Sequence, residues 1–200
     1  MNYKKFYGKN IEQMPKLISE GLKPMTIKEI IRRRLNCEEY FKSNWFDTCD
    51  MVVCFKDKFK IEKDCDLLRS INPNTELKNR GIKITEEQYK KLKGKEFQKG
   101  VSKEDVWKYL LENLYDDYMK LLGYCPEYYL TDYDLSGRSF YVDGLEGDWS
   151  YVDGGDDVDG GVGRLVGYAT ELQVKKVKIL KSIPTKIEYK GYIYVLENGQ

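Results

Sequence analysis

The order of helix and strand signals constrains the fold of this 200-residue chain more than any other feature. A short aromatic run, Tyr3 to Tyr7, ends at Gly8 and predicts a strand at the very start. Amphipathic helix patterns then fill the N-terminal and middle parts, whereas short alternating runs dominate after Tyr124. Helices early and strands late favour an α+β fold over repeated βαβ units. We therefore expect a mainly antiparallel sheet, completed by the C-terminal third and the first strand.

Residues that cap a helix N-terminus locate the expected helices. The four candidates are Asn10, Thr26, Thr85 and Ser102. Thr26 and Thr85 are each followed three residues later by Glu or Gln, which makes a capping box. Ser102 opens the longest predicted helix, over 102–122, with an apolar stripe expected to pack into the core. In the second helix, the run 32–34 of three arginines is either a solvated face or a small phosphate-facing patch.

Strand signals frame the helices. Met51 to Phe55 predicts a buried strand that pairs with Lys58 to Ile61. Later strands are expected at 139–142, 149–152, 165–169 and 171–180, with a final hairpin over 187–196. The phrase Tyr-Val-Asp-Gly occurs at 141–144 and again at 151–154, which fits similar strand ends on neighbouring strands. No linker composition interrupts the pattern, so we expect a single domain over residues 1–200.

Composition excludes several classes of function. The chain has no His, which removes the usual general base and most zinc sites. Lys and Arg number 34 against 33 Asp and Glu, so the net charge of +1 disfavours nucleic acid as a partner. The sequence contains neither a secretory leader nor a membrane span, and we expect a cytoplasmic protein. Its five cysteines include no Cys-x-x-Cys pair, and each is expected to be a small buried apolar residue.

An acidic, glycine-rich loop over 143–159 is the most unusual segment. The stretch 139–163 contains seven Asp or Glu and no Lys or Arg. Its carboxylates would suit a divalent cation such as Ca²⁺ or Mg²⁺, although no window fits the twelve-residue calcium loop. The same charge would suit a basic protein surface as partner, or the loop is only solvated.

Two segments resemble the ADP-ribosyltransferase-like superfamily. Residues 6–12 and 17–24 are similar to the first strand, with its Tyr-His-Gly-Thr-like signature, and to the following helix with its Leu-x-x-Gly-Leu-like end. Residues 168–174 are similar to the strand that carries the glutamate of that superfamily. The resemblance implies an NAD-dependent transferase, a glycosyltransferase in the broad sense, that binds NAD or a related nucleotide. A phage or mobile-element origin, in active or degenerate form, fits this reading.

The same resemblance implies the site residues. Glu171 would be the catalytic residue that contacts the nicotinamide ribose, and Tyr7 and Gly8 would bind the cofactor, with no metal ligand assigned. Tyr7 stands where many members have His. Two alternatives stay open from the residues themselves. One is a non-enzymatic interaction or inhibitor protein that uses the acidic loop 143–159 against a basic partner. The other is a metal-dependent nuclease that uses carboxylates of that loop with Glu171 and a nearby lysine.

Overall fold

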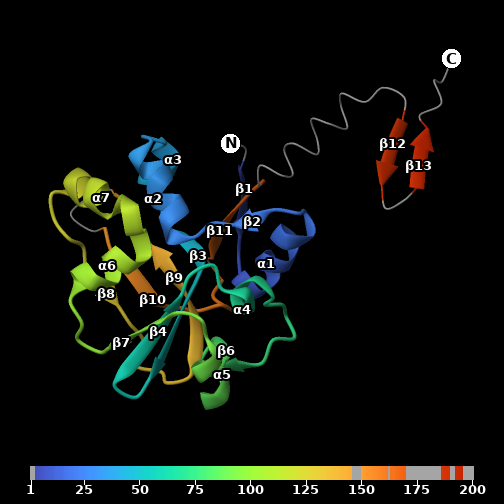
Figure 1. Cartoon of the computed structure of the whole chain (residues 1–200). Helices are drawn as coiled ribbons and strands as arrows, with labels where there is room; N and C mark the ends of the chain where they lie inside the picture. Colours follow the sequence, from blue (N-terminus) through green and yellow to red (C-terminus); the bar gives the residue numbers. More distant parts are fainter. Residues whose placement is uncertain (1–2, 146–149, 162, 170–185, 190–191, 196–200) are drawn as a thin grey trace.

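A computed structural model describes residues 3–145, 150–161, 163–169, 186–189 and 192–195 (Figure 1). Its helices are α1 (Asn10–Ser19), α2 (Ile27–Leu35), α3 (Glu39–Lys42), α4 (Asp66–Arg69), α5 (Glu86–Lys91), α6 (Lys103–Leu111), the 3-10 turn η1 (Glu112–Leu114) and α7 (Tyr115–Leu122). Its strands are β1 (Tyr3–Tyr7), β2 (Lys23–Pro24), β3 (Phe46–Phe55), β4 (Lys58–Glu62), β5 (Leu77–Lys78), β6 (Gly81–Lys83), β7 (Lys95–Gln98), β8 (Tyr128–Tyr129), β9 (Ser136–Val142), β10 (Val152–Asp156), β11 (Arg164–Tyr168), β12 (Lys186–Tyr189) and β13 (Tyr192–Val195).

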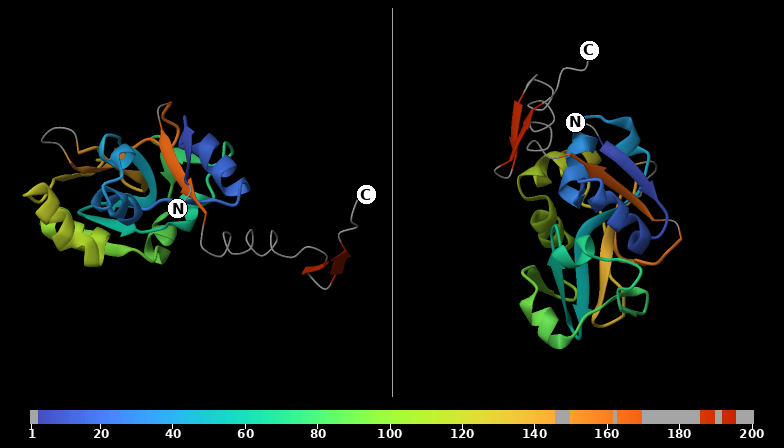
Figure 2. Two further views of the ribbon diagram at one scale, coloured as in Figure 1. Left: turned by 90° about the horizontal axis from the view of Figure 1, so that it is seen from above. Right: turned by 90° about the vertical axis from the view of Figure 1, so that its right-hand side faces the viewer.

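The first strand completes a sheet with a late strand, as the order of signals predicted. β1 pairs antiparallel with β11, from Tyr3 opposite Tyr168 to Tyr7 opposite Arg164. β2 extends this small sheet on the other edge of β11. β1 and β11 lie side by side in every view (Figures 1 and 2). The mixed fold with antiparallel sheets confirms the predicted α+β class.

The larger sheet has the order β5-β6-β9-β3-β4-β7, with β10 paired to β9 and β8 paired to β10. Neighbours along that order are antiparallel, whereas β8 and β10 are parallel. The predicted final hairpin is present as β12 and β13. The strand expected at 171–180 lies outside the described residues, as does Trp149 at the start of the one expected at 149–152.

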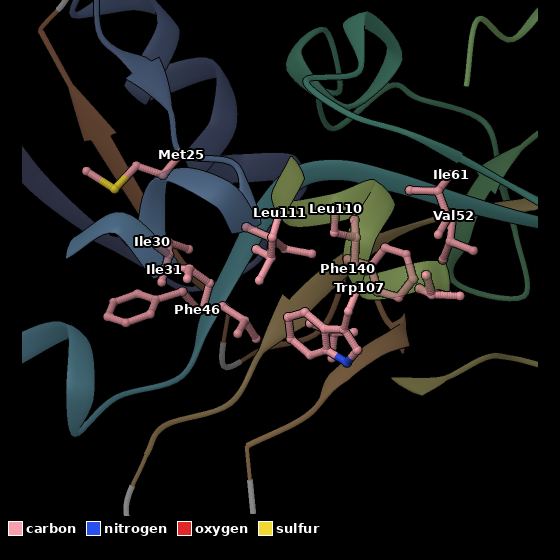
Figure 3. Close-up of a cluster of buried hydrophobic side chains, with 14 of the residues drawn as sticks. Met25, Ile30, Ile31, Phe46, Val52, Ile61, Trp107, Leu110, Leu111 and Phe140 are labelled. Atoms are coloured by element: carbon pink, nitrogen blue, oxygen red, sulfur yellow. The ribbon is translucent and has the colours of Figure 1, made fainter. Parts of the chain in front are cut away.

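Side chains that alternate along β3 fill two apolar cores, one on each face of the sheet. Val52 belongs to a core that α2 and α6 cover, and Figure 3 shows this cluster with Val52 beside Ile61 and with Ile30, Ile31, Trp107 and Leu110 contributed by the two helices. The neighbouring Val53 belongs to a second core, which side chains of α1, α4 and α5 cover. A strand covered on both faces is buried along nearly its whole length, and the first nine residues of β3 are buried.

β3 is twice as long as the strand predicted over Met51 to Phe55. The prediction left out its first half because that half contains polar residues, which the fold buries. The Thr48 hydroxyl donates to the carbonyl oxygen of Phe140 at 2.7 Å. The Asp50 carboxylate accepts backbone N–H bonds from Ile27 at 2.7 Å and from Asp64 at 2.9 Å. Buried polar groups are tolerated when they are hydrogen-bonded, so this polar sequence forms a strand rather than a loop.

The single helix predicted over 102–122 is wrong. The chain breaks it at Glu112, whose φ of 54° lies in the left-handed region. The Glu112 carboxylate forms ion pairs with Lys28 and Lys63, which lowers its pKa to about 2. The break turns α7 relative to the apolar stripe, so Leu110 is fully buried whereas Leu121 is 47% exposed.

No helix in the described residues is long and apolar enough to cross a membrane.

Local capping predictions met mixed outcomes. Both capping boxes, at Thr26 and Thr85, are present. Asn10 is not a cap, because α1 starts at Asn10 itself and its side chain is buried. Three cysteines are buried as predicted, but Cys37 is exposed and Cys125 is half-buried.

Candidate ligand-binding surface

The repeated Tyr-Val-Asp-Gly phrase builds two adjacent strands with one buried and one outward face. Val142 on β9 lies opposite Val152 on β10, and both side chains are fully buried. Side chains alternate along a strand, so the residues on either side of each valine point to the other face. Tyr141 and Asp143 flank Val142, and Tyr151 and Asp153 flank Val152; all four are partly exposed. The duplication therefore places two tyrosines and two carboxylates on the outward face.

Trp45, the residue just before β3, joins these residues. Phe46 on β3 is buried and lies opposite Val142, so Trp45 just before it belongs to the outward face. Trp45, Tyr141, Asp143 and Tyr151 line a cavity of about 320 Å³. We call these four residues the aromatic pocket.

A fully buried arginine holds the chain segments that carry the aromatic pocket. Arg34 of α2 donates to the carbonyl oxygens of Asn44, at 3.2 Å, and of Asp143. It also donates to the Tyr118 hydroxyl at 3.1 Å, which in turn lies 2.8 Å from the hydroxyl of Ser150. Asn44 directly precedes Trp45, Asp143 is itself a pocket residue, and Ser150 directly precedes Tyr151. Arg34 is thus neither on a solvated face nor in a phosphate patch, the two readings left open for the triplet.

The rim of the aromatic pocket contains a cation that rests on its aromatic wall. The Arg164 guanidinium carbon lies 5.0 Å from the Trp45 ring centroid and 5.6 Å from that of Tyr7. An Arg164 nitrogen also donates to the side-chain oxygen of Asn44. On the other side, Tyr129 packs edge-to-face on Tyr151 with centroids 5.2 Å apart. The aromatic surface therefore extends beyond the pocket in both directions.

The titration of Tyr141 favours binding over proton transfer. Burial and a 2.7 Å hydrogen bond from its hydroxyl to that of Tyr151 raise the pKa of Tyr141 well above its ordinary value. A general base works best with a pKa near the working pH, and this shift moves Tyr141 away from it. Its hydroxyl stays protonated at neutral pH and acts as a hydrogen-bonding group on an apolar ring.

The two residues to which the family resemblance assigned cofactor binding, Tyr7 and Gly8, lie at the end of β1 and in the turn after it. Tyr7 is 56% exposed at the end of β1, with its hydroxyl 3.2 Å from that of Tyr40. Gly8 has a φ of 116° and donates its N–H to the Gly163 carbonyl, so it serves the turn after β1. Glu171, the predicted catalytic residue, lies outside the described residues. Tyr7 therefore meets another tyrosine and Arg164, and its proximity to Glu171 stays untested.

The acidic loop is engaged by arginines of this chain. Asp157 pairs with Arg80 and Arg138 at 2.6 Å each, and Asp159 pairs with Arg80 at 3.0 Å. Val158 between them is fully buried and anchors the loop. Within the described ranges no cluster of three metal-ligating side chains occurs, and a Ca²⁺ or Mg²⁺ site at this loop stays a prediction. Two of the seven acids thus belong to the scaffold.

Comparison with known proteins shows the fold alone. No family model and no curated protein matches the chain. A solved structure described under the heading "Accommodation of massive sequence variation in Nanoarchaeota by the C-type lectin fold" is similar to it, with a TM-score of 0.54 and 15% identity. The match covers 83% of this chain and 97% of that chain. The chain therefore has a C-type lectin fold.

This finding corrects the reading as an ADP-ribosyltransferase. The quoted segments are short, and a capped helix closed by Gly-Leu-Lys-Pro forms in many folds, so local likeness misled about the whole. The NAD-dependent transferase, its NAD cofactor and the phage-encoded inhibitor are not supported. Sequence reasoning also missed Trp45. Nothing near it in the sequence distinguishes this half-buried ring from Trp107, which is fully buried and donates its indole N–H to the Pro126 carbonyl oxygen.

Proposed function

We propose that this chain is a recognition domain that binds its ligand in the aromatic pocket. The observation that carries the proposal is the convergence of three rings and one carboxylate on the outward face of β9, β10 and the start of β3. Aromatic side chains supply large contact area with little conformational entropy to lose, and tyrosine hydroxyls and carboxylates add direction. A hollow in which ring faces meet a few convergent polar groups is a common form of ligand site.

The fold supports the same proposal. The similar solved structure is described as a case in which the C-type lectin fold accommodates massive sequence variation. A fold that tolerates variation suits recognition, because the surface can change while the core stays fixed. In this chain the inward valines Val142 and Val152 hold the strands, and the outward residues next to them are available for a ligand.

The test is a binding screen with matched aromatic deletions. An array of glycans and of peptides with unmodified and modified side chains is probed with the wild type, Trp45→Ala and Tyr133→Ala. Tyr133 is 50% exposed and does not line the aromatic pocket, so its loss controls for nonspecific stickiness. We expect array members that bind the wild type and Tyr133→Ala but lose binding to Trp45→Ala. Binding that survives Trp45→Ala, or a wild type that binds nothing on the array, would refute the proposal.

A further inference from the structure

We infer that the aromatic pocket binds an alkylated ammonium group, the cationic head that choline and N-trimethyllysine share. This inference rests on the proposed function and names its ligand class. It depends on three properties of the pocket: the angles between its rings, the sign of its charge, and the ring faces against which methyl groups can pack.

The three rings form walls that meet at steep angles. Trp45 and Tyr141 have centroids 6.3 Å apart and planes inclined by 73°. Tyr141 and Tyr151 have centroids 5.8 Å apart and planes inclined by 72°. Successive walls at such angles surround a guest from several sides, whereas coplanar rings would offer one flat platform. The faces of aromatic rings are the negative ends of their quadrupoles, so a hollow between them favours a cation.

The lining of the aromatic pocket carries a charge of the matching sign, whereas Arg164 adds a positive charge at the rim. Asp143 lines the pocket, and one of its oxygens accepts the Gly144 N–H at 2.8 Å. In the part of the chain that the structure describes, Asp143 forms no ion pair with a lysine or an arginine. The surrounding stretch 139–163 contains no basic residue. The Arg164 guanidinium over Trp45 shows that this wall already accepts a cation. A second cation in the pocket would be neutralised by Asp143.

The ring faces of the aromatic pocket favour the alkylated form of the cation. An unmodified ammonium brings three N–H donors, and each needs an acceptor oxygen once water is lost, which a ring face does not supply. Among the side chains that line the pocket, acceptor oxygens are confined to Asp143 and the two tyrosine hydroxyls, and the Tyr151 hydroxyl already accepts from Tyr141. A trimethylammonium group brings the same charge without N–H donors, and its methyl groups contact the rings directly. The cavity of about 320 Å³ also leaves room for the chain that carries the head.

Calorimetric titration with charged and uncharged ligands of one shape tests the inference. Choline is compared with dimethylbutanol, in which a tert-butyl group replaces the trimethylammonium group. We expect choline to bind about tenfold more tightly, as a desolvated cation–π contact of between 1 and 2 kcal/mol would give. N-trimethyllysine should likewise bind more tightly than lysine. If trimethyllysine binds and choline does not, the source is a modified protein rather than a free choline group.

Two variants separate charge from shape. Asp143→Asn keeps an oxygen for the Gly144 N–H and removes the charge, so it should weaken choline several-fold and leave dimethylbutanol unchanged. Tyr133→Ala should change neither. Equal affinity for choline and dimethylbutanol, or no binding of any ammonium ligand, would overturn this inference. The recognition proposal would still stand if Trp45→Ala abolished binding of another array member, and would fall with the inference if it did not.

Discussion

Replacement of Arg34 by Met tests whether one buried cation holds the framework of the aromatic pocket. The guanidinium is fully buried and donates to the carbonyl oxygens of Phe41, Asn44 and Asp143 and to the Tyr118 hydroxyl. Methionine has a similar apolar length but no donor, so Arg34→Met leaves these acceptors without their partner. The volume in the core stays nearly filled, which separates lost hydrogen bonds from a cavity.

The magnitude follows from two opposing terms. Each hydrogen bond to a charged group contributes about 1.5 to 3 kcal/mol, whereas burial of the guanidinium costs several kcal/mol. Four bonds exceed that cost, and we expect Arg34→Met to lower the free energy of unfolding by about 3 kcal/mol. At a denaturant dependence of about 2 kcal/mol per molar urea, the midpoint of unfolding should fall by about 1 to 2 M.

Arg32 supplies the control on the same helix. It is exposed, so Arg32→Met removes the same charge and should shift the midpoint by less than about 0.3 M. Urea unfolding followed by circular dichroism measures both variants under the same conditions. Equal midpoints for Arg34→Met and Arg32→Met would show that the buried bonds contribute nothing, and the account of Arg34 would be wrong.

Two further predictions concern buried and paired carboxylates. Burial raises the pKa of Asp50 from 3.8 to about 7, so the native state keeps a proton that the unfolded chain has released. The free energy of unfolding should therefore fall as the pH rises from about 4 to about 7, and Asp50→Asn should lose this dependence when unfolding is followed over that range. Asp157→Asn should cost about 3 kcal/mol because it deprives the nearly buried Arg138 of its ion-pair partner, whereas Asp159→Asn, which removes only one of the two ion pairs of the exposed Arg80, should cost less than about 1 kcal/mol. Thermal unfolding that moved equally in the last two variants would contradict this ranking.

Features set by neighbouring residues could be predicted from the sequence. The capping boxes at Thr26 and Thr85 need only two side chains three residues apart, and both formed. The pairing of β3 with β4 needs only a short turn between alternating runs, and it formed with Met51 opposite Glu62. In each case the interaction that fixes the structure is already complete within a few residues of chain.

Features set by distant residues could not be predicted. The first half of β3 forms because Asp50 meets the N–H groups of Ile27 and Asp64, 23 and 14 residues away. The break at Glu112 depends on Lys28, which lies 84 residues away in the sequence. The aromatic pocket likewise needs Trp45 beside Tyr141, an approach that only the pairing of β3 with β9 creates. A sequence read in short windows contains none of these contacts.

The contacts that support the aromatic pocket leave its outward side chains free to vary without loss of the fold. Arg34 holds Asn44 and Asp143 by their backbone carbonyl oxygens, so the clamp does not depend on the side chains at those positions. Val142 and Val152 hold β9 and β10 together from the inward face, so the outward side chains beside them are not needed for core packing. Substitution of outward residues therefore changes what the pocket binds far more than it changes stability. Under the proposed recognition function, ligand specificity would therefore reside in side chains that core packing does not require.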